Sequence, residues 1–434
     1  MKRLFSRICG AALAAALVLS ALPAVPARAA GIQVTLNDQP LSFSDAQPLM
    51  RDDRTFVPFR AIFETMGATV SWDDASRTVT AKRSDRTVKL TIGRKACTVD
   101  RAGADRSFST DVAPFIEGGR TYVPIRFAAQ ALGAAVGWDS ASQTVLLVDT
   151  EKMMQSEFAG QFQAITAMTQ FANSVAPTSP RLISGAIGAT LTYHTTMGDL
   201  PVPITGTITG SESLDAAQFT AAFHADRTAI TQAIQDNEGM NVIDENVDAL
   251  LQKLENFSAD GILSRVDGKL YLKSDFLTEV GIAKGQWAMK DLDSTASLTA
   301  VKDGDATDFI CAQAQKLTLR PGTSTSQVRE VVRRLSDQSA SSPLNGTGSY
   351  SLHWTADNYT AVDMTLVPGQ SLTVMRTASP LGADAVPMTT LTTVQTKNGA
   401  SISYERSASS YNAAIRIDLN NGGAATTAPA VRPS

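Results

Sequence analysis

The sequence predicts an α+β protein, in which a duplicated small domain of antiparallel sheet and helices precedes a larger curved antiparallel β-sheet domain with helices on one face. The first supporting observation is a 26-residue stretch that begins at Arg54 and again at Arg120, 66 positions later, with fourteen identical positions. Because the same apolar and turn pattern occurs twice, one supersecondary unit is built twice. The second is a series of long alternating segments after residue 180, typical of strands in an antiparallel sheet.

Each copy is predicted to contain a strand, a short helix and a hairpin. An extended segment ending in proline precedes a short apolar run, and a glycine follows where a left-handed helix cap requires one. Alternating residues and an Asp-containing turn then predict the hairpin. The motif residues that recur are Arg54, Pro58, Arg60, Gly67, Trp72 and Asp73 in the first copy and Arg120, Pro124, Arg126, Gly133, Trp138 and Asp139 in the second.

This pattern, R-T-[FY]-V-P-x-R followed by G-A-x-V-x-W-D, resembles the copper amine oxidase N-terminal-like domain, also called the stalk domain. The resemblance covers about residues 31–149. In Gram-positive exported proteins this domain commonly carries two such copies. The resemblance therefore implies a cell-envelope module, often fused to unrelated partners, and it does not imply amine oxidation.

The sequence itself argues against amine oxidation. That chemistry needs a tyrosine in a T-x-x-N-Y-[DE] context and copper held by three histidines. Residues 355–360 resemble the context, but Thr360 occupies the acidic position. The chain has three histidines, none follows Tyr359, and no His-x-His pair could hold copper. We therefore expect a hairpin turn at 357–358, with no metal site and no cofactor.

The first 29 residues have the pattern of a signal peptide. Three basic residues precede an apolar run at 11–22 that is too short to span a bilayer, and Ala27 and Ala29 supply the small residues that signal peptidase reads. Cys9 precedes this run, whereas a lipid-modified cysteine would follow it. The sequence thus predicts a mature protein that is secreted or held non-covalently at the cell surface, without a transmembrane segment.

The net charge bears on which partners the protein could bind, and the cysteine content bears on whether it forms disulfides. The formal net charge is −4, and loss of the four basic residues of the signal peptide would leave −8. An acidic exported protein is a poor candidate for binding nucleic acid, so no nucleic-acid partner is expected. Cys97 and Cys311 remain after cleavage, and we favour two buried thiols over one bridge between domains.

Residues 150–420 are predicted to form a helix and a β-rich domain. Apolar residues recur at three- and four-residue steps from Phe158 to Val175, which predicts a helix with one apolar face. We expect this helix to lie against the concave face of a sheet made of residues 182–420. Residues 421–434, rich in Gly, Ala, Thr and Pro, are predicted to be a disordered tail.

Part of this region resembles the lipoprotein-carrier family of LolA and its LppX/LprG-type relatives. The resemblance rests on residues 268–273, Gly-Lys-Leu-Tyr-Leu-Lys, and on the Gly-Gln-Trp at 285–287. That family binds acyl chains in a cavity and performs no chemistry, although the lipobox of its lipoprotein members is missing here. The resemblance implies an apolar ligand, and a lipid or cell-wall component is the expected partner. We place Tyr271 and Trp287 near the edge of the ligand site.

The repeated charged and aromatic residues have both a functional and a structural interpretation. Arg60 and Arg126 could hold an anionic sugar or a peptide carboxylate, but we favour pairing of each with the aspartate of its own copy, Asp73 or Asp139. The two tryptophans of the repeat could stack on glycans, but an aromatic in a half-buried strand is usually core. On that interpretation, Trp138→Ala would cost about 3–5 kcal/mol.

The sequence contains no catalytic constellation: no Ser-His-Asp order, metal-ligand spacing or phosphate-binding glycine loop stands out. We therefore expect a non-enzymatic envelope protein, whose stalk module presents a β-rich domain that binds an apolar or extended ligand. A purely structural surface or assembly protein is the first alternative, and a wall-active hydrolase is the second. Cavity volume separates the first two, and activity against purified wall tests the third.

Overall fold

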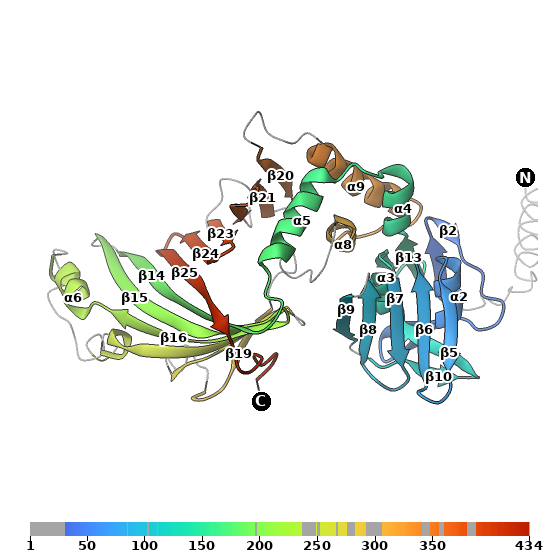
Figure 1. Ribbon diagram of the computed structural model, residues 1–434, viewed down its shortest axis with the longest axis horizontal. Coiled ribbons are helices and arrows are strands. Elements are labelled where there is room, and N and C mark those ends of the chain that lie inside the picture. Colours follow the sequence, from blue (N-terminus) through green and yellow to red (C-terminus); the bar gives the residue numbers. More distant parts are fainter. Residues whose placement is uncertain are drawn as a thin grey trace, which may run out of the picture.

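A computed structural model describes most of the chain after residue 30. The described residues are 31–84, 86–101, 104–110, 112–195, 198–236, 249, 252–265, 268–275, 283–291, 306–340, 348–355, 360–379 and 388–433. The predicted signal peptide and the turn expected at 357–358 lie outside them. Figure 1 shows the duplicated domain at one end, the large sheet at the other, and a group of helices between them.

The duplicated domain is built from three small sheets and two short helices. Its elements are β1 (Gln33–Leu36), β2 (Gln39–Pro40), β3 (Leu49–Arg51), β4 (Arg54–Pro58), α2 (Phe59–Thr65), β5 (Thr69–Asp73), β6 (Thr78–Arg83), β7 (Arg86–Thr91), β8 (Ala96–Arg101), β9 (Ala104–Ser109), β10 (Phe115–Glu117), β11 (Arg120–Pro124), α3 (Ile125–Ala131), β12 (Ala135–Asp139) and β13 (Thr144–Val148). The sheet orders are β12-β13-β1-β2, β10-β11-β4-β3 and β5-β6-β7-β8-β9. Strands β1 and β13 run parallel, which departs from the antiparallel sheets predicted for this domain.

A local twofold axis between β4 and β11 relates the two copies. Val57 lies opposite Val123, its own counterpart, and the pairs on either side exchange symmetrically. The hairpins before these strands also match, because both turn through two residues with positive φ, 52–53 in the first copy and 118–119 in the second. Two such residues are typical of a type I′ turn. The duplication in the sequence is therefore a duplication in the structure, as predicted.

Two salt bridges join equivalent positions across this axis. Arg51 pairs with Glu117 on the surface, whereas the side chains of Arg83 and Asp149 are buried and lie 2.8 Å apart. Asp149 also accepts a hydrogen bond from the Lys152 backbone N at 3.1 Å, so it caps the helix that follows the domain. The buried pair thus connects the first copy to the start of the next region.

The described strands after residue 180 form one twelve-stranded antiparallel sheet. Its strands are β14 (Arg181–Thr195), β15 (Gly198–Glu212), β16 (Ala216–Ala225), β17 (Phe257–Ser264), β18 (Lys269–Lys273), β19 (Ala288–Asp291), β20 (Tyr350–Thr355), β21 (Thr360–Val367), β22 (Ser371–Ala378), β23 (Met388–Thr396), β24 (Gly399–Ser407) and β25 (Tyr411–Ala424). Their order is β19-β18-β17-β16-β15-β14-β25-β24-β23-β22-β21-β20, so the last strand joins the two halves. Figure 1 shows the long strands bending along their length, which agrees with the predicted curved sheet.

The helix predicted from Phe158 to Val175 begins later than expected, at Gln163, and ends at Val175 as predicted. The helices of this region are α4 (Thr150–Glu157), α5 (Gln163–Val175), α6 (Arg227–Asp236), α8 (Ala306–Ala314) and α9 (Ser324–Ala340). Gly160, between α4 and α5, has φ +74°, a left-handed conformation that interrupts a helix. Phe158 and Phe162 are buried in this connection, so they match an apolar spacing without belonging to α5.

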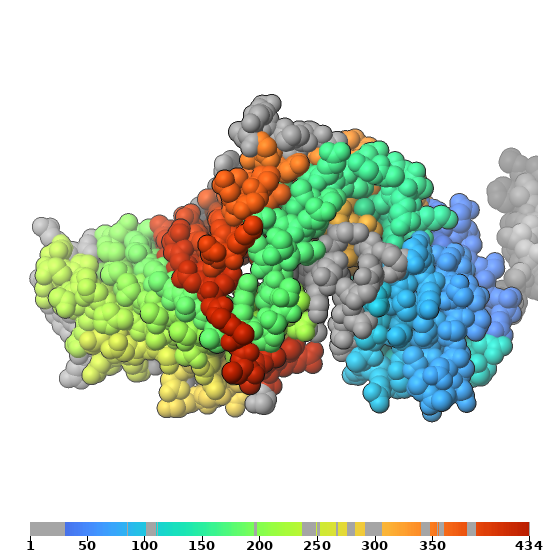
Figure 2. All heavy atoms as spheres, viewed as in Figure 1, coloured from blue at the N-terminus to red at the C-terminus, as the bar shows by residue number. Residues whose placement is uncertain are grey.

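The helices cover one face of the large sheet at its two sides. Helix α5, with α9 and α8, packs on the β20–β22 side, where Met168 and Val332 share a core with Val362. Helix α6 packs on β15, where Ile230 contacts the cluster around Ile204. Figure 2 shows α5 in contact with the orange and red strands.

Strand register places these two helices on the same face. Residues opposite one another in paired strands point to the same side, and one such row runs Ile204, Ala189, Ile415, Tyr404, Leu391, Arg376 and Val362. We call the face that carries this row the inner face and the opposite one the outer face. The prediction of helices on one face of the sheet is confirmed.

The second copy of the repeat packs directly on the helices. Its Leu146 and Val148 belong to the same hydrophobic cluster as α4, α5, α8 and α9. The Cys311 thiol of α8 donates to the Gly133 carbonyl over 3.3 Å. Asp38 accepts the Thr325 backbone N–H at the start of α9 over 3.0 Å, and hydrogen bonds to Ser324 and Thr325 hold its pKa below the usual value, outweighing the opposing effect of burial.

The C-terminal segment differs from the disordered tail predicted for residues 421–434. Strand β25 continues to Ala424, because it stays paired with β14 beyond residue 420. Beyond the strand, the Ala430 N–H donates to the Gln218 side chain over 3.0 Å, and Pro429 is buried. Gln218 lies on the outer face, so the segment crosses that face at β16.

Candidate ligand-binding face

The middle of the inner face carries apolar side chains that the packed helices do not bury fully. Strands β24 and β25 contribute Ile402, Tyr404, Ile415, Ile417 and Leu419, all partly exposed. In contrast, inner-face residues beneath the helices, such as those in the clusters of α5 and α6, are buried. The face therefore presents an apolar strip between two covered sides, and we call these five residues the central strip.

The central strip continues onto neighbouring strands. Ile417 lies opposite Ile402 on one side and Ile187 on the other. Ile187 and Ile208 belong to a small cluster that Phe219 and Ile417 extend. Gly185 and Gly206 stand among these positions and contribute no side chain to the strip.

Tyr271 and Trp287 are not at this strip. Tyr271 lies opposite Ile262, and both alternate away from Leu270 and Leu272, so Tyr271 is on the outer face. The Lys273 Nζ lies 5.1 Å from the centroid of the Trp287 ring, a cation–π contact. The two aromatics thus lie near each other at the β18–β19 side of the sheet but do not face the helices.

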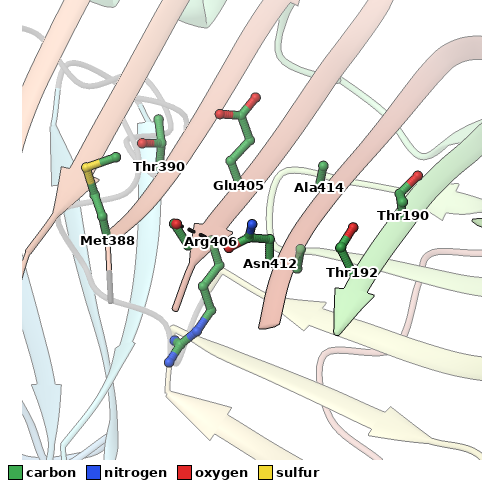
Figure 3. Close-up of a pocket in the computed structure, with 10 residues that line it drawn as sticks. Thr190, Thr192, Met388, Thr390, Glu405, Arg406, Asn412 and Ala414 are labelled. Atoms are coloured by element: carbon green, nitrogen blue, oxygen red, sulfur yellow. Dashed lines mark hydrogen bonds between the residues drawn. The ribbon is translucent and has the colours of Figure 1, made fainter. Parts of the chain in front are cut away.

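The outer face has a shallow hollow of about 300 Å³. Its lining includes the polar residues Thr190, Thr390, Glu405 and Asn412 together with the apolar Met388 and Ala414. Figure 3 shows the Glu405 and Arg406 side chains pointing in opposite directions from the same strand. Adjacent residues of β24 thus belong to opposite faces of the sheet.

The two tryptophans of the repeat are exposed rather than buried. Trp72 is 39% exposed and Trp138 is 41% exposed, each on the edge strand of its sheet. The prediction that they form core was wrong, because an edge strand of a small sheet has one face with nothing packed on it. Their positions suit contact with another molecule as well as they suit solvent.

The arginines of the repeat do not pair with the aspartates as predicted. Arg60 pairs with Glu64 one helical turn away, at 3.2 Å. Asp73 instead accepts hydrogen bonds from Ser76 and the Ala75 N–H, which hold the pKa of its carboxyl below the usual value. Asp139 is held in the same way by Ser142. Each aspartate therefore stabilises its own hairpin turn. A serine three residues further along the chain is a nearer partner for the carboxylate than the arginine of the short helix.

Other groups that carry chemistry are dispersed. Within the described ranges, no three His, Cys, Asp or Glu side chains stand close enough together to hold a metal ion. Cys97 and Cys311 are both buried and form no disulfide, which confirms that prediction. Among the helices of the described residues, none is long and apolar enough to cross a membrane.

The residues that sequence reasoning missed are those of the central strip. Alternation in 399–407 and 411–419 was visible in the sequence, but the partner strands that bring these residues together were not. Register between distant strands depends on the whole sheet, and β14 pairs with β25 across more than 200 residues.

Comparison with known proteins supports the resemblance found in the repeat. Residues 35–154 match the copper amine oxidase N-terminal domain family. No curated protein matches the chain. The match covers the duplicated domain and the start of α4, and it does not extend to the large sheet.

Proposed function

We propose that this chain is a non-enzymatic exported envelope protein whose large sheet binds an apolar or extended ligand along the central strip. The observation that carries the proposal is the partly exposed Ile402, Ile415 and Ile417 on the inner face, between sides covered by α5 and α6. Apolar area left beside a covered core is a site where a ligand gains about 25 cal/mol per Å² that it buries. The duplicated domain, fixed to the same helices, would hold this sheet in the envelope.

Displacement of a fluorescent fatty acid tests the proposal. Ile415→Asn places an amide on the central strip, and Ala414→Asn places the same group on the outer face one residue away. We expect saturable binding by the wild-type chain and by Ala414→Asn, and at least tenfold weaker binding by Ile415→Asn. Equal binding by the two variants, with melting temperatures like wild type, would locate the ligand elsewhere.

A structural scaffold is the second candidate function. It is favoured by the large core in which α5, α8 and α9 pack against β20–β22, since that part of the sheet is filled by the chain itself. A scaffold would give no saturable binding in the displacement assay. The same assay therefore separates the two functions.

A further inference from the structure

Charges are distributed unequally between the two faces of the large sheet. Carboxylates at outer-facing strand positions include Asp199, Asp260, Asp363, Glu405 and Asp418. At the inner-facing positions of the described strands of this sheet, the charged residues are Arg181, Glu212, Lys290, Arg376 and Arg406. The described strands thus place one carboxylate on the inner face, in a chain whose formal net charge is −4.

That single carboxylate is already neutralised. Glu212 accepts from Arg181 at 2.8 Å and from Arg265 at 3.0 Å, at one end of the sheet. The other charged residues at inner-facing positions of the described strands are Arg376, Arg406 and Lys290, and all three are basic. Two of these, Arg376 and Arg406, stand next to the central strip.

Arg406 marks one end of the central strip. Tyr404 of β24 lies opposite Ile415 of β25, and Arg406 lies opposite Ala413. Arg406 therefore occupies the inner-facing position next to the Tyr404–Ile415 pair, at the end of the central strip. Its guanidinium is 5.6 Å from the Tyr411 ring centroid. The buried Arg406 Nε–H donates no hydrogen bond to the described part of the chain, and a buried donor of this kind usually has a partner.

Arg376 adds a second positive charge beside it. It lies opposite Leu391, the residue that follows Tyr404 in the same cross-strand row, and it is only 8% exposed. A buried guanidinium in an apolar setting strengthens the local positive potential, because little water screens it. The strip is therefore apolar along β24 and β25 and positive at one end.

We propose that the inner face takes an amphiphile, with its alkyl chain over Ile402, Ile415 and Ile417 and an anionic head group, a carboxylate or phosphate, at Arg406. This rests on the ligand-binding function proposed above and adds the chemical class and the orientation of the ligand. Guanidinium suits both head groups because it donates two parallel hydrogen bonds to them. Long side chains can also point a charge toward water without any ligand, and the experiment distinguishes that case.

Calorimetric titration of the purified chain with laurate and with dodecanol tests the proposal. Both probes have the same alkyl chain, but only laurate carries an anionic head. We expect wild type to bind laurate about tenfold or more tightly than dodecanol, since charge-assisted hydrogen bonds are the stronger kind. Arg406→Gln should lose that preference while still binding dodecanol, and Arg406→Lys should keep most of it.

Arg416→Gln is the matched control, because Arg416 lies on the outer face of β25 and pairs with Asp418. It should retain the preference for laurate. Equal affinities of wild type for the two probes would overturn the anionic head group and leave the ligand-binding function standing. If Arg406→Gln and Arg416→Gln lose the preference for laurate equally, the preference comes from the overall charge of the protein, and the assignment of the head group to Arg406 is overturned. Binding of neither probe would reject the ligand-binding function itself. The wild-type comparison decides the question even if Arg406→Gln fails to fold.

Discussion

The two copies of the repeat share a motif but have different surroundings. Gly67 and Gly133 both have positive φ, +84° and +69°, so each copy needs glycine to end its helix. A Cβ at Gly67 would meet open space, whereas one at Gly133 would lie 2.7 Å from the Glu151 carboxylate. The motif therefore encodes the fold of each copy, and the residues around it determine which copy packs on the rest of the protein.

The same contrast holds one strand further along. Gly137 lies under Leu319, and a Cβ there would approach the Leu319 side chain to 2.7 Å. Its counterpart in the first copy is Ser71, which is exposed. At these two motif positions the second copy packs on the rest of the chain and the first copy does not, so shared motif residues report architecture, and ligand binding is better sought in the large sheet.

The largest expected loss of stability comes from breaking one of the two salt bridges that cross the twofold axis. Arg83→Met would leave the Asp149 carboxylate buried without its partner, and loss of one member of a buried pair costs about 3–5 kcal/mol. Arg51→Met removes the exposed equivalent and should cost less than about 1 kcal/mol. Urea unfolding of both variants measures the difference. Similar losses would mean that the two pairs are equally screened by solvent.

Glycine substitutions should separate the copies next. Gly67→Ala meets only the left-handed backbone penalty of about 1–2 kcal/mol. Gly133→Ala adds a clash with Glu151, which typically costs about 1–3 kcal/mol more. Thermal unfolding of the two variants should show the larger drop in melting temperature for Gly133→Ala. Equal drops would indicate that Glu151 moves aside at no cost.

Exchanging the residues at the equivalent positions Gly137 and Ser71 compares the surroundings of the two copies directly. Gly137→Ser introduces the residue of the first copy beneath Leu319, and we expect a loss of about 1–3 kcal/mol from overpacking. Ser71→Gly makes the reverse change on an exposed strand and should cost about 1 kcal/mol or less, as glycine does in a strand interior. A neutral Gly137→Ser in chemical denaturation would show that Leu319 does not press on this strand.

The smallest effect is expected at the tryptophans. Because Trp138 is 41% exposed, Trp138→Ala should cost well below the 3–5 kcal/mol of a buried aromatic. We expect about 1 kcal/mol or less, and a similar value for Trp72→Ala. A full loss of 3–5 kcal/mol in either variant would show that the ring is packed against a surface in solution.

Local pattern was sufficient to predict the repeat but not its contacts. Glycine caps, proline-ended strands and Asp turns are decided within a few residues, so the architecture of each copy followed from the sequence. Arg83 and Asp149 occupy equivalent positions with opposite charges, a signal in the sequence that spacing alone could have revealed. Burial of the tryptophans could not be read in the same way, because it depends on whether another sheet or helix covers that edge.

The large sheet shows the same limit. Alternation predicted its strands, and the apolar spacing predicted α5, although the helix begins only at Gln163, after the left-handed Gly160. The faces occupied by Tyr271 and Arg406 depend on register across several strands, and a shift of one residue exchanges the faces. The motif at residues 268–273 therefore predicted a family resemblance, but it could not predict that Tyr271 lies on the face opposite the central strip.

Native mass spectrometry of the freshly purified chain tests the central claim most directly. If the inner face binds an amphiphile, wild type should carry an additional mass that organic extraction releases as an alkyl-chain compound. Ala414→Asn should carry the same mass, and Ile415→Asn should carry little of it. Wild-type protein that shows only the mass of its own chain and binds neither laurate nor dodecanol would contradict the account.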